Sequence, residues 1–298
     1  MKTLTRLAFT LGISATAVDA QSSLEIAPAS PTLSERVSLT PAWELTGFSM
    51  PESAVAAPDH PWIYVSNVNG DAPGFISRVS KDGKIDNLKW AEVGGSPTGL
   101  ALYDGRLYAG NSTQVDVVEV ATGEILDPIT SNIAQTLNDV TVAQDGTLYV
   151  SDVIGGKVYV LQNGSLVEFF SSPELTHPNG VLVEGGMLFV GDTAGGLSPD
   201  FSPATHGSVY KVDLSDNSFS VVPTADRLGA VDGVTGTADV MFASSNQTGE
   251  LFAFSDRERI RLGTFKPGLA DIGVFGDLLL APFLFDDTVI GFNVTVAE

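Results

Sequence analysis

The stretch 137–152, LNDVTVAQDGTLYVSD, carries the pattern that decides the fold. An apolar strand pattern at 137–142 leads to the turn pair Asp145-Gly146, and a second strand pattern follows at 148–152. An Asp-Gly pair between two alternating apolar runs is a strong hairpin signal. We therefore expect two antiparallel strands here, joined by a tight turn.

The same unit recurs along the chain, most clearly as PNGVLVEGGMLFVGD at 178–192. The copy that starts at 137 continues with two more strand patterns around the turn pair Asn163-Gly164. The corresponding positions of the six copies are Glu52, Thr98, Asn138, Asn179, Asp232 and Asp271. They are spaced about 40 to 50 residues apart, which is the period of propeller repeats. Since four antiparallel strands make one blade, we predict an all-β fold, a six-bladed β-propeller with four-stranded antiparallel blades.

The two ends of the repeat region complement each other. The sixth copy is short and ends at 289–294, and the stretch 42–48, AWELTGF, can supply its missing outer strand. This closure would hide the strand edges of the ring. We expect the propeller to occupy residues 41–298 and the Ser/Pro-rich stretch 21–40 to be a flexible leader.

Residues 1–20 have the features of a signal peptide. Lys2 and Arg6 form a positive start, an apolar stretch follows at 7–18, and small residues precede a cleavage point after Ala20. The apolar stretch is too short to cross a bilayer, and we expect no membrane span in the mature chain. The chain has no cysteine, so disulfides cannot stabilise it. We expect an exported protein, periplasmic or secreted.

The formal net charge of −21 limits the kinds of partner. An acidic excess spread along the chain argues against nucleic acid and anionic membrane surfaces as partners. It favours cation binding, although solubility in a saline habitat would explain the same charge. We expect a monomer that meets a small-molecule substrate.

The six corresponding positions all carry a side-chain oxygen, and in a propeller such positions lie around one axis. Four of them, two carboxylates and two amides, form the predicted metal site: Glu52, Asn138, Asn179 and Asp232. Two negative charges match one divalent cation, and hard oxygen ligands suit Ca²⁺, with Mg²⁺, Mn²⁺ or Zn²⁺ as alternatives. Zinc is the less favoured metal, because the chain lacks cysteine and its three histidines have no ligand spacing.

A supporting layer around these four residues is also predicted, from Asp271, Asp139 and Thr98. The alternative interpretation is that Asn, Asp and Gly stand at these places only because they form turns. Oxygen donors at all six corresponding positions favour the metal site.

These motifs resemble those of the SMP-30/gluconolactonase/LRE-like family of six-bladed propellers, over roughly residues 45–295. The resemblance is carried by Pro51-Glu52, 137–139, 178–180 and 231–233. It implies that a Glu, two Asn and an Asp at these places bind a divalent metal in the channel. Two departures concern the sugar-lactone substrate: Ser53-Ala54 follows Glu52 in place of Gly-Pro, and Thr136 stands where an Arg often holds a sugar acid.

The function expected from this site is metal-dependent hydrolysis of lactones or related esters. Asp232 is the candidate general base, and His177, two residues before Asn179, is a candidate base or substrate donor. The alternative is a non-catalytic propeller that binds a peptide, glycan or protein partner. A redox or lyase enzyme on the same scaffold is a third alternative, but no Gly-rich phosphate loop supports it.

Overall fold

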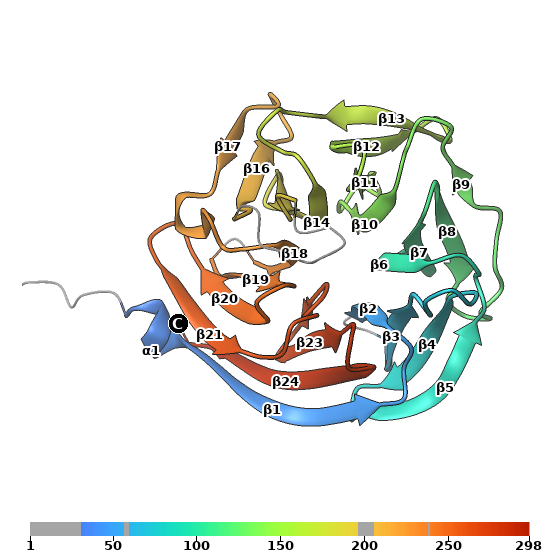
Figure 1. Ribbon diagram of the computed structural model, residues 1–298, viewed down its shortest axis with the longest axis horizontal. Helices are drawn as coiled ribbons and strands as arrows, with labels where there is room; N and C mark the ends of the chain where they lie inside the picture. Colours follow the sequence, from blue (N-terminus) through green and yellow to red (C-terminus); the bar gives the residue numbers. More distant parts are fainter. Residues whose placement is uncertain (1–30, 57–59, 196–205, 238, 298) are drawn as a thin grey trace, which may run out of the picture. The chain divides into compact units, whose positions relative to one another are not determined.

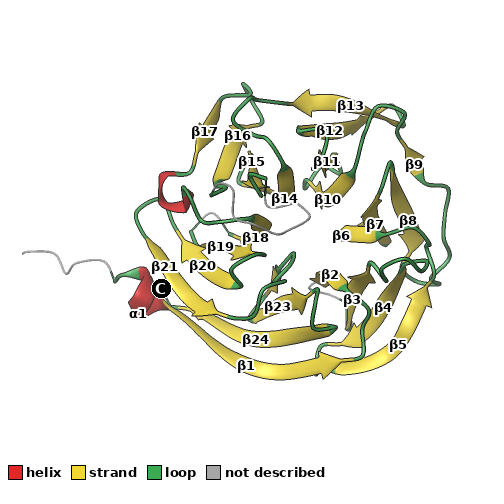
Figure 2. Cartoon of the chain, viewed as in Figure 1, coloured by secondary structure: helices red, strands yellow, loops and turns green. Residues whose placement is uncertain are grey.

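The computed structural model describes residues 31–56, 60–195, 206–237 and 239–297. Six four-stranded antiparallel sheets are arranged as blades around a common centre, which confirms the predicted six-bladed propeller (Figure 1). Almost every described element is a strand (Figure 2). No helix among the described residues is long and apolar enough to cross a membrane.

Each blade runs outward from its innermost strand. Blade 1 comprises β2 (Pro51–Ala56), β3 (Trp62–Asn67), β4 (Phe75–Ser80) and β5 (Lys84–Ala91). Blade 2 comprises β6 (Pro97–Tyr103), β7 (Arg106–Asn111), β8 (Gln114–Glu119) and β9 (Ile129–Thr130). Blade 3 comprises β10 (Leu137–Val142), β11 (Leu148–Asp152), β12 (Lys157–Gln162) and β13 (Ser165–Phe170).

The other half of the ring repeats this order. Blade 4 comprises β14 (Pro178–Glu184), β15 (Met187–Asp192), β16 (Val209–Asp213) and β17 (Phe219–Val221). Blade 5 comprises β18 (Val231–Gly236), β19 (Met241–Ser245), β20 (Glu250–Phe254) and β21 (Arg259–Thr264), and the short helix η1 (Pro223–Ala225) precedes it. Blade 6 comprises β22 (Gly273–Phe275), β23 (Leu278–Phe283), β24 (Thr288–Val296) and β1 (Val37–Thr46).

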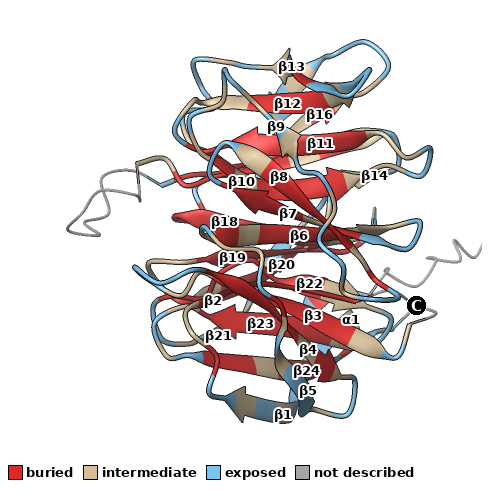
Figure 3. Ribbon diagram, turned by 90° about the vertical axis from the view of Figure 1, so that its right-hand side faces the viewer, coloured by how far each residue is buried: buried red, intermediate tan, exposed pale blue. Residues whose placement is uncertain are grey.

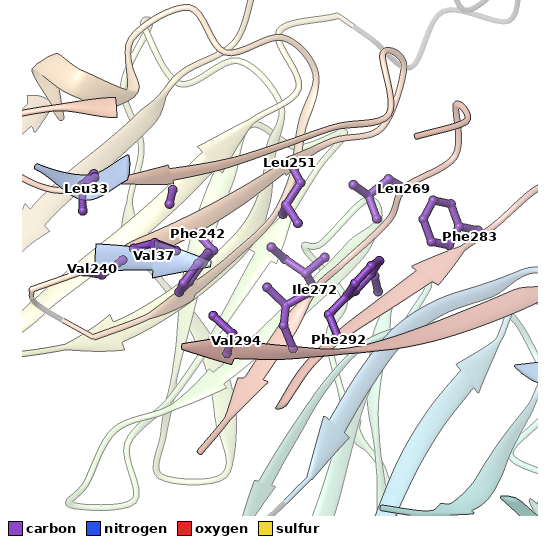
Figure 4. Close-up of a cluster of buried hydrophobic side chains, with 13 residues drawn as sticks. Leu33, Val37, Val240, Phe242, Leu251, Leu269, Ile272, Phe283, Phe292 and Val294 are labelled. Carbon is purple, nitrogen blue, oxygen red and sulfur yellow. The ribbon is translucent and has the colours of Figure 1, made fainter. Parts of the chain in front are cut away.

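Strand β1 closes the ring from the other end of the sequence. It pairs antiparallel with β24 from Val37↔Val296 to Thr46↔Thr288, as the stretch 42–48 predicted for the outer strand of the sixth blade. The ordered part begins earlier than expected: the helix α1 (Leu33–Arg36) and the first residues of β1 lie within 21–40, which we expected to be a flexible leader. Leu33 and Val37 are buried against blades 5 and 6, and this packing orders the segment (Figure 4). The predicted signal peptide, 1–20, lies outside the described residues.

The apolar side chains of the blades form separate clusters between neighbouring sheets. One cluster lies between blades 5 and 6, and it includes Phe242, Leu251, Leu279 and Phe292 (Figure 4). The inner strands are buried along most of their length, whereas outer strands such as β1 and β5 are largely exposed (Figure 3). Polar side chains on the inner strands therefore have little access to water.

Candidate metal centre

An extra residue lies at the start of the innermost strand in blades 1 to 5, and just before that strand in blade 6. In blade 3, Leu137 pairs with Asp152 and Val140 pairs with Val150, so three steps on β10 match two steps on β11. The same β-bulge falls between Pro51/Ala54, Pro97/Leu100, Pro178/Val181 and Val231/Val234. In blade 6, the pairs Leu269↔Phe283 and Gly273↔Leu280 imply one extra residue around Asp271. A bulge re-aims the side chains next to it.

These bulges hold all six positions that the sequence singled out. The bulged segments pack against one another at the centre of the propeller. The Asp271 backbone N–H donates to the carbonyl of Glu52 at 2.9 Å, and the Thr98 hydroxyl donates to the carbonyl of Asn138 at 2.8 Å. A Cβ on Gly180 would approach the carbonyl oxygen of Asp232 to 2.3 Å. Residues that are far apart in sequence therefore form one small site.

The four predicted ligands each keep one buried oxygen without a hydrogen-bond partner: Glu52 Oε2, Asn138 Oδ1, Asn179 Oδ1 and Asp232 Oδ1. We call these residues the ring. Buried polar atoms without partners are rare in proteins and costly, because the atom loses its hydrogen bonds to water. Four such oxygen atoms on equivalent blade positions form the donor set of a hard cation, so these residues fit a divalent metal ion.

The electrostatics of the site also favour a bound cation. Burial, and then the negative charges of Asp232, Asp271 and Asp139, raise the pKa of Glu52 well above its usual range. Burial also raises the pKa of Asp232 to about 7, against the hydrogen bond from Asn246, which lowers it. The charged groups that act on Glu52 are all carboxyl groups, and the ion pairs of the described residues involve other side chains. A bound cation would remove this repulsion.

Carboxylate and amide donors must be counted together to find this site. No group of three or more His, Cys, Asp or Glu side chains in the described ranges is placed to hold a metal ion. The ring has two carboxylates and two amides. It suits calcium, which accepts amide oxygens readily, better than zinc, which favours His and Cys.

The supporting residues are occupied by contacts between blades. Asp139 accepts the Val181 N–H at 2.6 Å and the Val140 N–H at 2.7 Å, and burial raises the pKa of Asp139 to about 7. Asp271 accepts the Ser53 hydroxyl at 2.6 Å, and burial is again the largest cause of its raised pKa. The Thr98 hydroxyl donates to the backbone carbonyls of Gly110 and Asn138. All three residues thus position neighbouring blades.

The central channel continues beyond the ring as a cavity of about 280 Å³. Residues of all six blades line it, and its polar lining includes Ser53, Asp139, Thr141, Thr235 and Asp271. Ser53 and Asp139 immediately follow the ring residues Glu52 and Asn138. The ring therefore lies next to one end of this cavity.

His177 lies in the loop that leads into Asn179. Its backbone N–H donates to Asp192 Oδ1 at 2.8 Å, and its imidazole contacts the Thr176 hydroxyl rather than a ring residue. His177 is two residues before the ring residue Asn179, but the structure shows no contact between its imidazole and a ring residue.

The site includes one residue, Asn246, that the sequence did not indicate. Asn246 donates from Nδ2 to Asp232 Oδ2 at 2.7 Å, and it lies just after β19. Asn246 begins the tripeptide Asn-Gln-Thr, so the sequence offered only a glycosylation motif at this place. Nothing in the repeat spacing marks it.

The comparisons with known proteins support the fold. No family model and no curated protein matches the chain. A solved structure of a proposed gluconolactonase is similar, with a TM-score of 0.66 and 19% identity, covering 88% of this chain and 94% of that chain. A nidogen/laminin complex gives a TM-score of 0.62 and 15% identity, covering 74% of this chain and 86% of the other.

A third similar structure is a catalytically inactive virginiamycin B lyase from Staphylococcus aureus with quinupristin. Its TM-score is 0.56 and its identity 12%, covering 87% of this chain and 99% of that chain. At such low identities the likeness shows the propeller architecture alone. The three proteins differ in what they do, so only the site of this chain can indicate its function.

Proposed function

We propose that this chain is an exported hydrolase that depends on a divalent metal and acts on lactones or related esters. The observation that carries the proposal is the set of four buried oxygen atoms without partners, one each on Glu52, Asn138, Asn179 and Asp232. The similarity to a proposed gluconolactonase supports the choice of reaction, and the donor set supports calcium as the metal.

Each ring residue has a role in this proposal. The cation, when bound, would polarise an ester or lactone carbonyl and stabilise the charge that develops on its oxygen. Glu52, Asn138 and Asn179 hold it through side-chain oxygens. Asp232 also contributes its Oδ1 to the cation, while its Oδ2 accepts the hydrogen bond from Asn246, and its carboxylate is the group proposed to take the proton of an attacking water.

His177 is proposed as a second proton donor or acceptor at the same site. Its loop is fixed by Asp192, whose carboxylate accepts the backbone N–H groups of His177 and Ala194. Rotation of the imidazole away from the Thr176 hydroxyl would free it for a substrate. Thr136 lies where a sugar acid would meet an arginine in the family that the sequence resembles, so a sugar acid is not the substrate that we favour.

The test is metal analysis of the purified protein, followed by calcium addition to the metal-stripped chain. Calcium is expected to raise the melting temperature and to restore turnover of a panel of lactones and esters. Asp232→Asn should lose both effects, whereas Asp256→Asn, at an exposed carboxylate in a bend, should keep them. If neither calcium nor another divalent cation binds, the proposal fails.

Binding without turnover would favour a different function. A nidogen/laminin complex has a similar fold, so a propeller that binds a protein, peptide or glycan is the second candidate. It predicts that calcium stabilises the protein while every ester and lactone stays intact. Export is tested separately, by sequencing the N-terminus of protein recovered from the periplasm or the medium.

A further inference from the structure

We infer that Asn246 is a positioning residue for the ring, and that its side-chain amide fixes the Asp232 carboxylate in the orientation that binds the cation. The inference rests on the proposed metal site. Asn246 Nδ2 donates to Asp232 Oδ2 at 2.7 Å, and Asp232 Oδ1 remains buried without a partner. One oxygen of the carboxylate is thus held, and the other is left for the metal.

Asp232 is the one ring residue whose side chain has a hydrogen-bond partner among the described residues. Ligating carboxylates are usually hydrogen-bonded in turn, and such outer contacts fix the direction of the ligand. Without the amide, rotation about the carboxylate's last bond would turn Oδ1 away from the other donors. The side chain would then lose rotamer freedom only when the metal binds, which lowers affinity.

Blade 5 departs from the other blades at this point. In blades 1 to 4, the last residue of the second strand turns its side chain to a backbone N–H in the loop that leads into the inner strand. The acceptors are Asn67, Asn111, Asp152 and Asp192, and the donors are Ser49, Ser96, Thr136 and His177. In blade 5 the corresponding residue is Ser245, whose hydroxyl instead accepts from Thr248.

Asn246 stands one residue beyond this position, and its side chain reaches a ring carboxylate instead of a loop backbone. Its main chain supplies the link between loops: the Asn246 N–H donates to the Ala230 carbonyl at 2.9 Å, and the Asn246 carbonyl accepts the Gly268 N–H at 2.7 Å. These backbone bonds do not depend on the side chain. The amide can therefore be replaced with the loop still held in place.

This arrangement gives the Asn-Gln-Thr tripeptide a role other than glycan attachment. The amide nitrogen that would carry a glycan is the atom that donates to Asp232. By contrast, Asn293 is exposed on β24 and begins another such tripeptide, Asn-Val-Thr. It provides a matched control.

The experiment measures calcium affinity by isothermal titration calorimetry on the metal-stripped chain. Asn246→Leu keeps the side-chain size and removes the donor, and it is expected to weaken calcium binding by about ten- to a hundredfold. Its melting temperature without metal should stay within a few degrees of that of the unchanged chain. Asn293→Leu should keep the full affinity.

The outcomes separate the two ideas. If the unchanged chain binds no calcium, the metal site fails and Asn246 has nothing to position. If the unchanged chain binds calcium and Asn246→Leu binds it equally well, the metal site stands and the role of Asn246 is refuted. Should the leucine variant not fold, Asn246→Gln replaces it, because an amide moved outward by one methylene must also weaken binding.

Discussion

Four carboxyl groups lie together at the centre of the molecule, on Glu52, Asp139, Asp232 and Asp271, and burial raises the pKa of each. In the unfolded chain such groups ionise near pH 4. A group whose pKa is higher in the folded state stabilises the fold at low pH, and this stability is lost as the pH rises toward the folded pKa. For Asp139 and Asp232 that window runs from about pH 4 to about 7.

We therefore predict that the metal-stripped protein becomes less stable as the pH rises from about 4 to about 7. One pKa unit corresponds to about 1.4 kcal/mol, so the loss for a single buried carboxyl group is on the order of a few kcal/mol. Calcium should flatten the profile, because the cation favours the ionised form. Thermal unfolding at several pH values, with and without calcium, checks this, and a metal-free stability that rises toward about pH 7 would contradict it.

The sequence identified the four donors and three supporting residues, but it did not indicate Asn246. The donors could be predicted because the repeat places one oxygen-bearing residue per blade at the same position; they are Glu52, Asn138, Asn179 and Asp232. Asn246 could not be found in this way, since it occurs once, outside the repeat register. Its role comes from a contact across the blade, between the end of β19 and the start of β18.

The inner strands and their bulges are the elements that form the ring. Alternation of apolar and polar residues predicted the strands, but it gave no sign of the extra residue at their start, because a bulge only shifts the register by one. Buried serines help to satisfy three of the bulges. The hydroxyls of Ser66, Ser151 and Ser244 accept the N–H groups of Ser53, Asp139 and Gly233.

Gly110, on the second strand of blade 2, is predicted to be essential for the position of Asn138. A Cβ added there would lie 2.0 Å from the Asn138 carbonyl oxygen, which is backbone and cannot rotate away. Gly110→Ala should therefore shift the bulge of blade 3, destabilise the fold by about 1–3 kcal/mol and weaken calcium binding. Chemical denaturation and calcium titration measure the two effects.

Gly164 supplies the comparison for that variant. It lies in an open hairpin turn with a φ of +79°, and an added Cβ would meet no neighbouring atom. Gly164→Ala should cost about 1 kcal/mol through backbone strain and leave the calcium affinity unchanged. Equal loss of calcium affinity in both variants would argue against a specific link between Gly110 and Asn138.

The period of about 40 to 50 residues was enough to predict the six blades and the closure of the propeller. It was less informative about where the closure begins. Composition suggested a loose leader up to residue 40, whereas α1 and the start of β1 are ordered because Leu33 and Val37 complete the apolar cluster between blades 5 and 6 (Figure 4). Burial against partners that are distant in sequence overrides local composition.

Strand β1 closes the whole propeller, so its removal should affect the entire fold. A chain that starts at Gly47 lacks β1 and leaves the backbone groups of β24 unpaired along nine residues, together with an uncovered apolar cluster. Unpaired strand edges and exposed apolar surface promote association between chains. We expect this chain to aggregate, whereas a chain that starts at Thr32 should remain monomeric and unfold cooperatively, as measured by size-exclusion chromatography with light scattering and by thermal unfolding.

Because the ring residues lie on the inner strands of blades held in a closed circle, opening that circle should also abolish calcium binding. A truncated chain that stays monomeric and still binds calcium would show that the blades hold the ring without this closure.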